Sequence, residues 1–178
     1  ENVPANALYK AWHMPGRFDK DFYSAELLSD ILSRGHSSRL YNKLVKEKEV
    51  FTSISSFTMG TLDPGMMIIS GRVKEGINLE EAEEQVSEVL NTLLEKGLAE
   101  DELQKVKNQA QTMQEFEKVE VINRAMNLAF AALSGNADLV NQEADLIESV
   151  TSEEAIEIGK KIFDENNSNV LYYNSKSA

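Results

Sequence analysis

The sequence predicts an α+β fold, in which a small antiparallel or mixed sheet has several helices packed on one face. Strand-like segments lie near both ends of the chain, and two more flank the turn Asp63-Pro64-Gly65. Long segments with apolar residues three and four positions apart fill the rest. Because a single hairpin is local, we expect the first and last strands to pair with it non-locally. With 178 residues and no linker or repeat, residues 1–178 are expected to form one domain.

The first strand is expected over residues 5–13. Apolar and polar residues alternate there, which places Leu8 and Trp12 on the same face of the strand. Pro15-Gly16 follows directly and is typical of a turn. This strand should therefore have one buried face.

Two helices are expected next. Asp19 or Asp21 can accept a hydrogen bond at the start of a helix that runs to about Ser33, since apolar residues there follow helical spacing. A shorter helix is expected over residues 38–48. The two helices are separated by a glycine, which favours a turn.

A hairpin is expected in the middle of the chain. Residues 50–59 are rich in β-branched and aromatic residues and read as a strand. Residues 66–73 read as the partner strand, after a turn at residues 61–65. Methionines 59, 66, 67, 113 and 126 fall on strands or helix faces and are expected to fill the core.

Helices dominate the second half. One runs from Asn78, a helix-capping residue, to Gly97. The next begins at residue 99 or 100 and continues to 133, with a break expected near residues 117–121. Two further helices are expected over residues 139–148 and 151–163.

The last helix and strand close the fold. Thr151 and Glu154 have the spacing of a capping box, in which each side chain accepts from the other residue's backbone N–H. Asn166-Asn167 then turns the chain, and residues 169–174 form the last predicted strand.

Composition excludes several classes of protein. With 18 Lys+Arg against 30 Asp+Glu, the net charge of −12 argues against binding to nucleic acid or to an anionic membrane. The absence of cysteine excludes disulfides, thiolate metal sites and cysteine nucleophiles. No apolar run is long enough for a membrane span. Composition does not choose between bacterial cytoplasm and periplasm, the compartments we expect.

The segment from Arg34 to Leu44 has the character of a helix start. Ser37 or Ser38 is expected to cap this helix, and no base suited to a serine nucleophile lies nearby in the sequence. Arg39 is the one candidate substrate-binding residue. Its guanidinium is expected either to pair with Glu47 or another carboxylate, or to bind a peptide carboxylate.

No catalytic residue and no metal ligand is expected in this chain. Zinc-protease sites use two histidines one helical turn apart, whereas His13 and His36 are far apart in the sequence. The acidic runs at residues 80–84 and 100–102 fall in the first turns of predicted helices, where negative charge complements the helix dipole. They are expected to be solvated.

Motifs along nearly the whole chain together resemble the second, non-zinc domain of pitrilysin/insulinase-type zinc metallopeptidases, the group that includes mitochondrial processing peptidase. They are Leu27-Leu28-Ser29-Asp30-Ile31-Leu32, Gly35-His36-Ser37-Ser38-Arg39-Leu40-Tyr41, Asp63-Pro64-Gly65, Ala99-Glu100-Asp101-Glu102-Leu103, Lys107-Asn108-Gln109 and Val150-Thr151-Ser152-Glu153-Glu154. Each motif is short, and the resemblance rests on their order and spacing.

The resemblance implies the metallopeptidase half-domain fold of the mitochondrial processing peptidase type and a division of labour. In the parent enzyme another domain would bind zinc through H-x-x-E-H, and this fragment would bind no cofactor and be inactive alone. The expected partners are the zinc-bearing domain of the same parent chain, a second half or subunit that closes as a clamshell, and a peptide substrate. We expect the chain, which begins at Glu1, to be cut from such a parent.

One departure from the family's pattern bears on its role. Where the assisting half of these proteases carries an arginine and, seven residues later, a tyrosine, this chain has Val45 and Thr52. The domain then belongs either to the zinc-bearing half of an active protease or to a catalytically inactive homologue that acts as a structural or assembly subunit; we favour the protease. A stand-alone peptide-binding module is a third interpretation.

Overall fold

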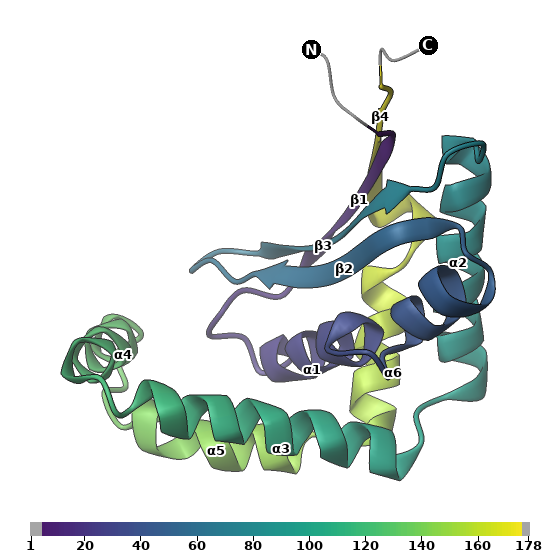
Figure 1. Ribbon diagram of the computed structural model, residues 1–178. Helices are drawn as coiled ribbons and strands as arrows, with labels where there is room; N and C mark the ends of the chain where they lie inside the picture. Colours follow the sequence, from purple (N-terminus) through teal and green to yellow (C-terminus); the bar gives the residue numbers. More distant parts are fainter. Residues whose placement is uncertain (1–4, 176–178) are drawn as a thin grey trace.

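The computed structural model describes residues 5–175, which form the α+β arrangement expected from the sequence. Helices cover one face of the sheet, and the opposite face is open (Figure 1). In chain order the elements are β1 (Ala7–Met14), α1 (Phe22–Ser33), the π-helical η1 (Tyr41–Glu47), β2 (Phe51–Met59), β3 (Gly65–Val73), α2 (Leu79–Lys96), α3 (Glu100–Glu117), α4 (Val121–Leu133), α5 (Leu139–Ser149), α6 (Ser152–Ile162), the 3-10 turn η2 (Glu165–Asn167) and β4 (Ser168–Tyr173).

The described sheet has the strand order β2-β3-β1-β4, and all its pairs are antiparallel. The β2–β3 hairpin is local, and β1 pairs with β3 as expected. The last strand does not pair with the hairpin: β4 lies against β1 instead. Strand β1, which has a partner on each side, is therefore central to the sheet, while β2 and β4 form its edges.

The core lies between the sheet and helices α1, α2 and α6. Strand β1 alternates as predicted, so Leu8 and Trp12 face the helices and are almost fully buried. The Trp12 ring meets Phe163, just after α6, in an edge-to-face contact with centroids 5.2 Å apart. One strand face thus links the sheet to the helical layer.

The segment after α1 differs in detail from the predicted helix over residues 38–48. Gly35 turns the chain with φ +80, a conformation that glycine adopts without strain. The following helix begins at Arg39 but is π-helical from Tyr41 to Glu47. Leu40 and Leu44 are both fully buried, as their spacing predicted.

Local signals located the later helices well. Asn78 accepts a hydrogen bond from the N–H of Glu81, and Gly97 ends α2 with φ +76. The predicted capping box of Thr151 and Glu154 is present at the start of α6. The expected break near residues 117–121 separates α3 from α4. No helix in the described part is long and apolar enough to cross a membrane.

Helices α3, α4 and α5 form an arm that extends beside the compact part of the molecule (Figure 1). Helix α4 lies at the end of this arm, and its apolar side chains are largely exposed. The prediction that the methionines fill the core is accordingly wrong for most of them. Met67 is buried, but Met59 and Met66 lie on the open sheet face and Met113 and Met126 lie on the arm.

A polar cluster joins β1, α2 and β4 on the covered side of the sheet. The ammonium of Lys10, a residue only 8% exposed, donates to Glu83 at 2.7 Å and to Ser87 at 3.3 Å. The hydroxyl of Tyr172 donates to the other Glu83 oxygen. Burial alone would raise the pKa of Glu83, but the hydrogen bonds from Lys10 and Tyr172 hold it below its usual range.

This cluster predicts a pH-dependent stability. Because the pKa of Glu83 is lowered in the folded state, its carboxylate stabilises the fold above the unfolded pKa of about 4.3 and loses that effect as the pH falls through the folded value. We expect Glu83→Gln to lower the free energy of unfolding near pH 7, and its difference from wild type to shrink toward about pH 3.

Urea denaturation across this pH range measures the difference. The matched control is Glu84→Gln, since Glu84 is an exposed neighbour on the same helix. The free energy of unfolding of this variant should change with pH nearly as that of the wild type does. A Glu83→Gln difference that stays constant or widens as the pH falls would contradict the role given to the cluster.

Candidate functional site

The open face of the sheet carries a row of residues that leaves a hollow. In register across the four strands lie Ser53, Arg72, Ala7 and Tyr173, all on the side away from the helices. Ala7 is short and stands between two long side chains, so the surface dips there. The hollow has a volume of about 320 Å³.

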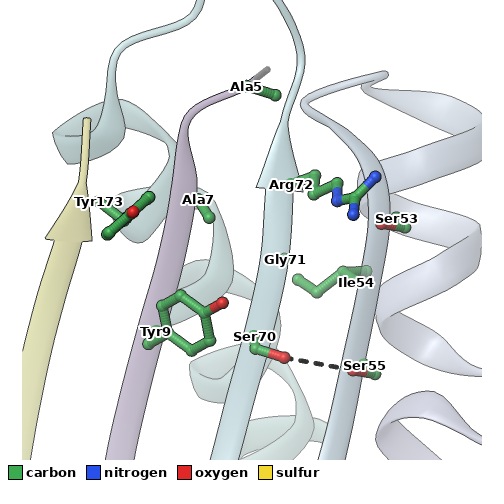
Figure 2. A pocket seen from close by; sticks show the side chains of 10 residues that line it. All are labelled: Ala5, Ala7, Tyr9, Ser53, Ile54, Ser55, Ser70, Gly71, Arg72 and Tyr173. Atoms are coloured by element: carbon green, nitrogen blue, oxygen red, sulfur yellow. Dashed lines mark hydrogen bonds between the residues drawn. The ribbon is translucent and has the colours of Figure 1, made fainter. Parts of the chain in front are cut away.

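The next row of the sheet completes the lining. Ser55 and Ser70 face each other with their hydroxyl oxygens 3.4 Å apart, and Tyr9 lies beside Ser70 on β1. Figure 2 shows Arg72 reaching from β3 toward Ser53 on β2, with Tyr9 on the other side of the hollow. Hydroxyl groups and one guanidinium therefore supply most of the polar groups around it.

Toward the far end of the same face the character changes to apolar. Phe57, Met59 and Met66 are between 39% and 46% exposed, so they present apolar surface to solvent. An extended chain lying along the sheet would thus meet apolar side chains at one end and the polar hollow at the other.

Arg39, the predicted substrate-binding residue, lies elsewhere. Its guanidinium binds both carboxylate oxygens of Glu102, at 2.9 and 2.7 Å, and donates to the carbonyl oxygen of Gly97 at 2.9 Å. The pairing partner is therefore Glu102 and not Glu47, which pairs with Lys43. Arg39 links the segment after α1 to the α2–α3 junction; a role in substrate binding stays a prediction.

The two serines before this helix do not cap it through their side chains. The Ser38 hydroxyl is buried and has no hydrogen-bond partner, and the Ser37 hydroxyl accepts from Lys105. The capping prediction was wrong: at this helix start the Ser38 carbonyl, and not a serine hydroxyl, accepts the backbone bond from the N–H of Asn42.

The two histidines lie on different parts of the fold. His36 lies exposed in the loop after α1 and stacks edge-on against Tyr41, and His13 is exposed near the end of β1 on the open face. Within residues 5–175, no three His, Asp or Glu side chains are close enough together to hold a metal ion. The described residues do not fit a zinc ion, and no reaction step is assigned to them.

A second polar group lies where the arm meets α1. Glu143 on α5 accepts from Arg17 at 2.7 Å and from the Tyr23 hydroxyl at 3.1 Å. Burial raises the pKa of the nearby Glu26, and the charge of Arg17 opposes that shift. This cluster could not be predicted from the sequence, because its members come from segments far apart in the chain.

Arg72 and its neighbours were also missed from the sequence. The usable signal was the position of Arg72 in a strand whose alternation places it on the face opposite Met67 and Ile69, both fully buried. Thr52, one of the two residues that depart from the family's pattern, lies close by and donates through its hydroxyl to the Arg72 carbonyl at 3.2 Å. Val45, the other, is partly buried against the core.

Comparison with protein families identifies the chain. Residues 1–110 match the model described as the peptidase M16 inactive domain. The chain belongs to this family. Among curated proteins, none matches the chain significantly. The membership agrees with the motifs and confirms the predicted non-zinc domain of a zinc-protease family.

Solved structures share the fold of this M16 domain. An inactive peptidase domain from Bordetella parapertussis has a TM-score of 0.88 and 20% identity, over 100% of this chain and 98% of that one. A protease from Helicobacter pylori has a TM-score of 0.87 and 17% identity, over 96% of this chain and 41% of that one. A chain of complex III2 from Candida albicans has a TM-score of 0.78 and 15% identity, over 97% and 43%.

The M16 domain should depend on the Arg39–Glu102 pair for stability. Both side chains are about a quarter exposed, and a two-pronged guanidinium–carboxylate contact is stronger than a single surface pair. We expect Arg39→Ala and Glu102→Ala each to lower the free energy of unfolding by about 1 kcal/mol, with the double variant close to either single one.

Chemical denaturation of the four proteins gives the coupling energy of this double-mutant cycle. The pair Lys43 and Glu47 is the control, because it lies on one exposed helix face and should couple much more weakly than Arg39 and Glu102. If the effects of Arg39→Ala and Glu102→Ala on the free energy of unfolding were fully additive, the Arg39–Glu102 contact would not contribute to stability.

Proposed function

We propose that this chain is the non-catalytic, chamber-forming and substrate-cradling domain of a zinc metalloendopeptidase. The observation that carries the proposal is the uncovered sheet face of a domain that belongs to the M16 inactive-domain family. A wall of a peptide chamber needs such a face, because it must offer apolar and polar groups to an unfolded chain. The parent would hydrolyse peptides with a zinc-activated water on another domain.

An extended peptide is the substrate that suits this surface. The two edge strands of the described sheet, β2 and β4, offer backbone groups to a chain that pairs alongside. The open face beside them carries exposed apolar residues toward one end and the hollow around Arg72 toward the other. The domain would therefore hold substrate by its backbone and its side chains without cleaving it.

Helix α4 supports a partner in the same parent chain. Ile122, Met126, Phe130 and Leu133 recur three or four residues apart, forming one stripe along the helix, and each is at least 51% exposed. A stripe of this kind marks a surface that another protein covers. We propose that the zinc-bearing domain of the parent covers it, consistent with the chain spanning 41% of the protease from Helicobacter pylori.

The alternative is a catalytically inactive homologue that acts as a structural or assembly subunit. The occurrence of the same fold in complex III2 from Candida albicans supports it, although at 15% identity that likeness shows the fold alone. Both functions require a protein that covers α4. They differ in whether the assembled protein hydrolyses peptides.

Association with a separately produced H-x-x-E-H domain of the parent tests the proposal. Calorimetry should show binding, and the mixture, but neither part alone, should cleave an unfolded peptide with zinc present. Ile122→Lys should weaken this association at least tenfold, since it places a charge in the exposed stripe that the zinc-bearing domain would cover.

Asn91→Lys is the matched control, because it adds the same charge to an exposed position on α2. It should bind as wild type does. Association without cleavage would favour the structural subunit. A parent gene without H-x-x-E-H, or no association at all, would reject the protease proposal.

A further inference from the structure

Arg72 differs from the other arginines near the body of the domain. Arg17, Arg34 and Arg39 each pair with a carboxylate at 2.7 to 2.8 Å. Within residues 5–175, the Arg72 guanidinium has no hydrogen-bond or ion-pair partner, and the side chain is exposed.

The surroundings of this guanidinium favour a single negative charge. The residues that line the hollow include no aspartate or glutamate, and Arg72 is their one charged member. The hydroxyls of Ser53, Ser55 and Ser70 lie on the same face and can donate to an anion held there. Opposite Arg72 on β1, the methyl side chain of Ala7 leaves room above the sheet.

We propose that this hollow binds a carboxylate of an extended peptide, held by the Arg72 guanidinium. A planar guanidinium binds a carboxylate through two parallel N–H donors. The hollow, with a volume of about 320 Å³, accommodates an acidic side chain or a chain terminus. The proposal rests on the peptide-cradling role above and specifies the substrate class: peptides with an aspartate, a glutamate or a free C-terminus at this position.

The overall negative charge of the protein acts against the binding of acidic peptides. A net charge of −12 repels acidic peptides at long range, so any preference for them must arise locally. It also disfavours multiply charged anions such as nucleic acid. Removing Arg72 should therefore reverse the preference and not merely weaken it.

Fluorescence anisotropy with the 178-residue chain at low ionic strength tests the proposal. Three labelled extended peptides share one apolar sequence: a neutral amidated peptide, the same peptide with one glutamate, and the neutral peptide with a free C-terminal carboxylate. We expect one or both carboxylate peptides to bind roughly tenfold more tightly than the neutral one. Which of them does so identifies the source of the carboxylate.

Variants assign the effect to Arg72. Arg72→Ala should bind the neutral peptide more tightly than the glutamate peptide, and Arg72→Lys, which keeps the charge but loses the paired donors, should fall in between. Arg124→Ala is the control, because it removes an exposed arginine on α4. It should keep the wild-type preference.

Backbone amide shifts on titration with sodium acetate locate the site independently, with the largest changes expected in residues 53–55 and 70–72. Equal binding of all three peptides, or a preference that survives Arg72→Ala, would overturn the proposal and leave the chamber role standing. No binding of any peptide together with no acetate shifts would overturn it as well. Loss of association with the zinc-bearing domain would instead count against the proposed function.

Discussion

One-sided burial of the four-stranded sheet is the constraint on which the rest of the structure depends. Strand β1 has a partner on each side, so its side chains can point only toward the helices or away from them. Leu8 and Trp12 point toward α1, α2 and α6 and close the core. Because side chains alternate, the same backbone necessarily sends Ala7 and Tyr9 to the other face. The open surface is a consequence of the way the core is filled.

The helices leave the second face of the sheet uncovered, because α3, α4 and α5 form the arm and do not pack on the sheet. Helices α3 and α5 pack against each other and against α1, and α4 contacts α5 at the end. Gly97 and the bidentate contact between Arg39 and Glu102 set the direction in which the arm leaves α2. The polar cluster around Glu143 supports it from the side of α1.

The sequence predicted well the features that depend on neighbours along the chain. Caps at Asn78 and Thr151, the glycine stop at Gly97 and the alternation of β1 all work within a few residues. Features that depend on distant segments were not accessible. Neither the partner of Arg39, the pairing of β4 with β1, nor the exposure of Met126 leaves a local trace. The candidate site belongs to this class, since its row of four residues comes from four strands.

The exposed helix α4 has a consequence for energetics. Apart from Ala131, its apolar side chains are not buried, so little packing supports its hydrogen bonds. At 13 residues it is near the length at which an isolated helix is only marginally stable in water. Its amide hydrogens should exchange with solvent far faster than those of the core helices. A partner that covers this helix must then also order it. The free energy spent on ordering lowers the affinity of the contact for a given buried area, so the two proteins can separate again.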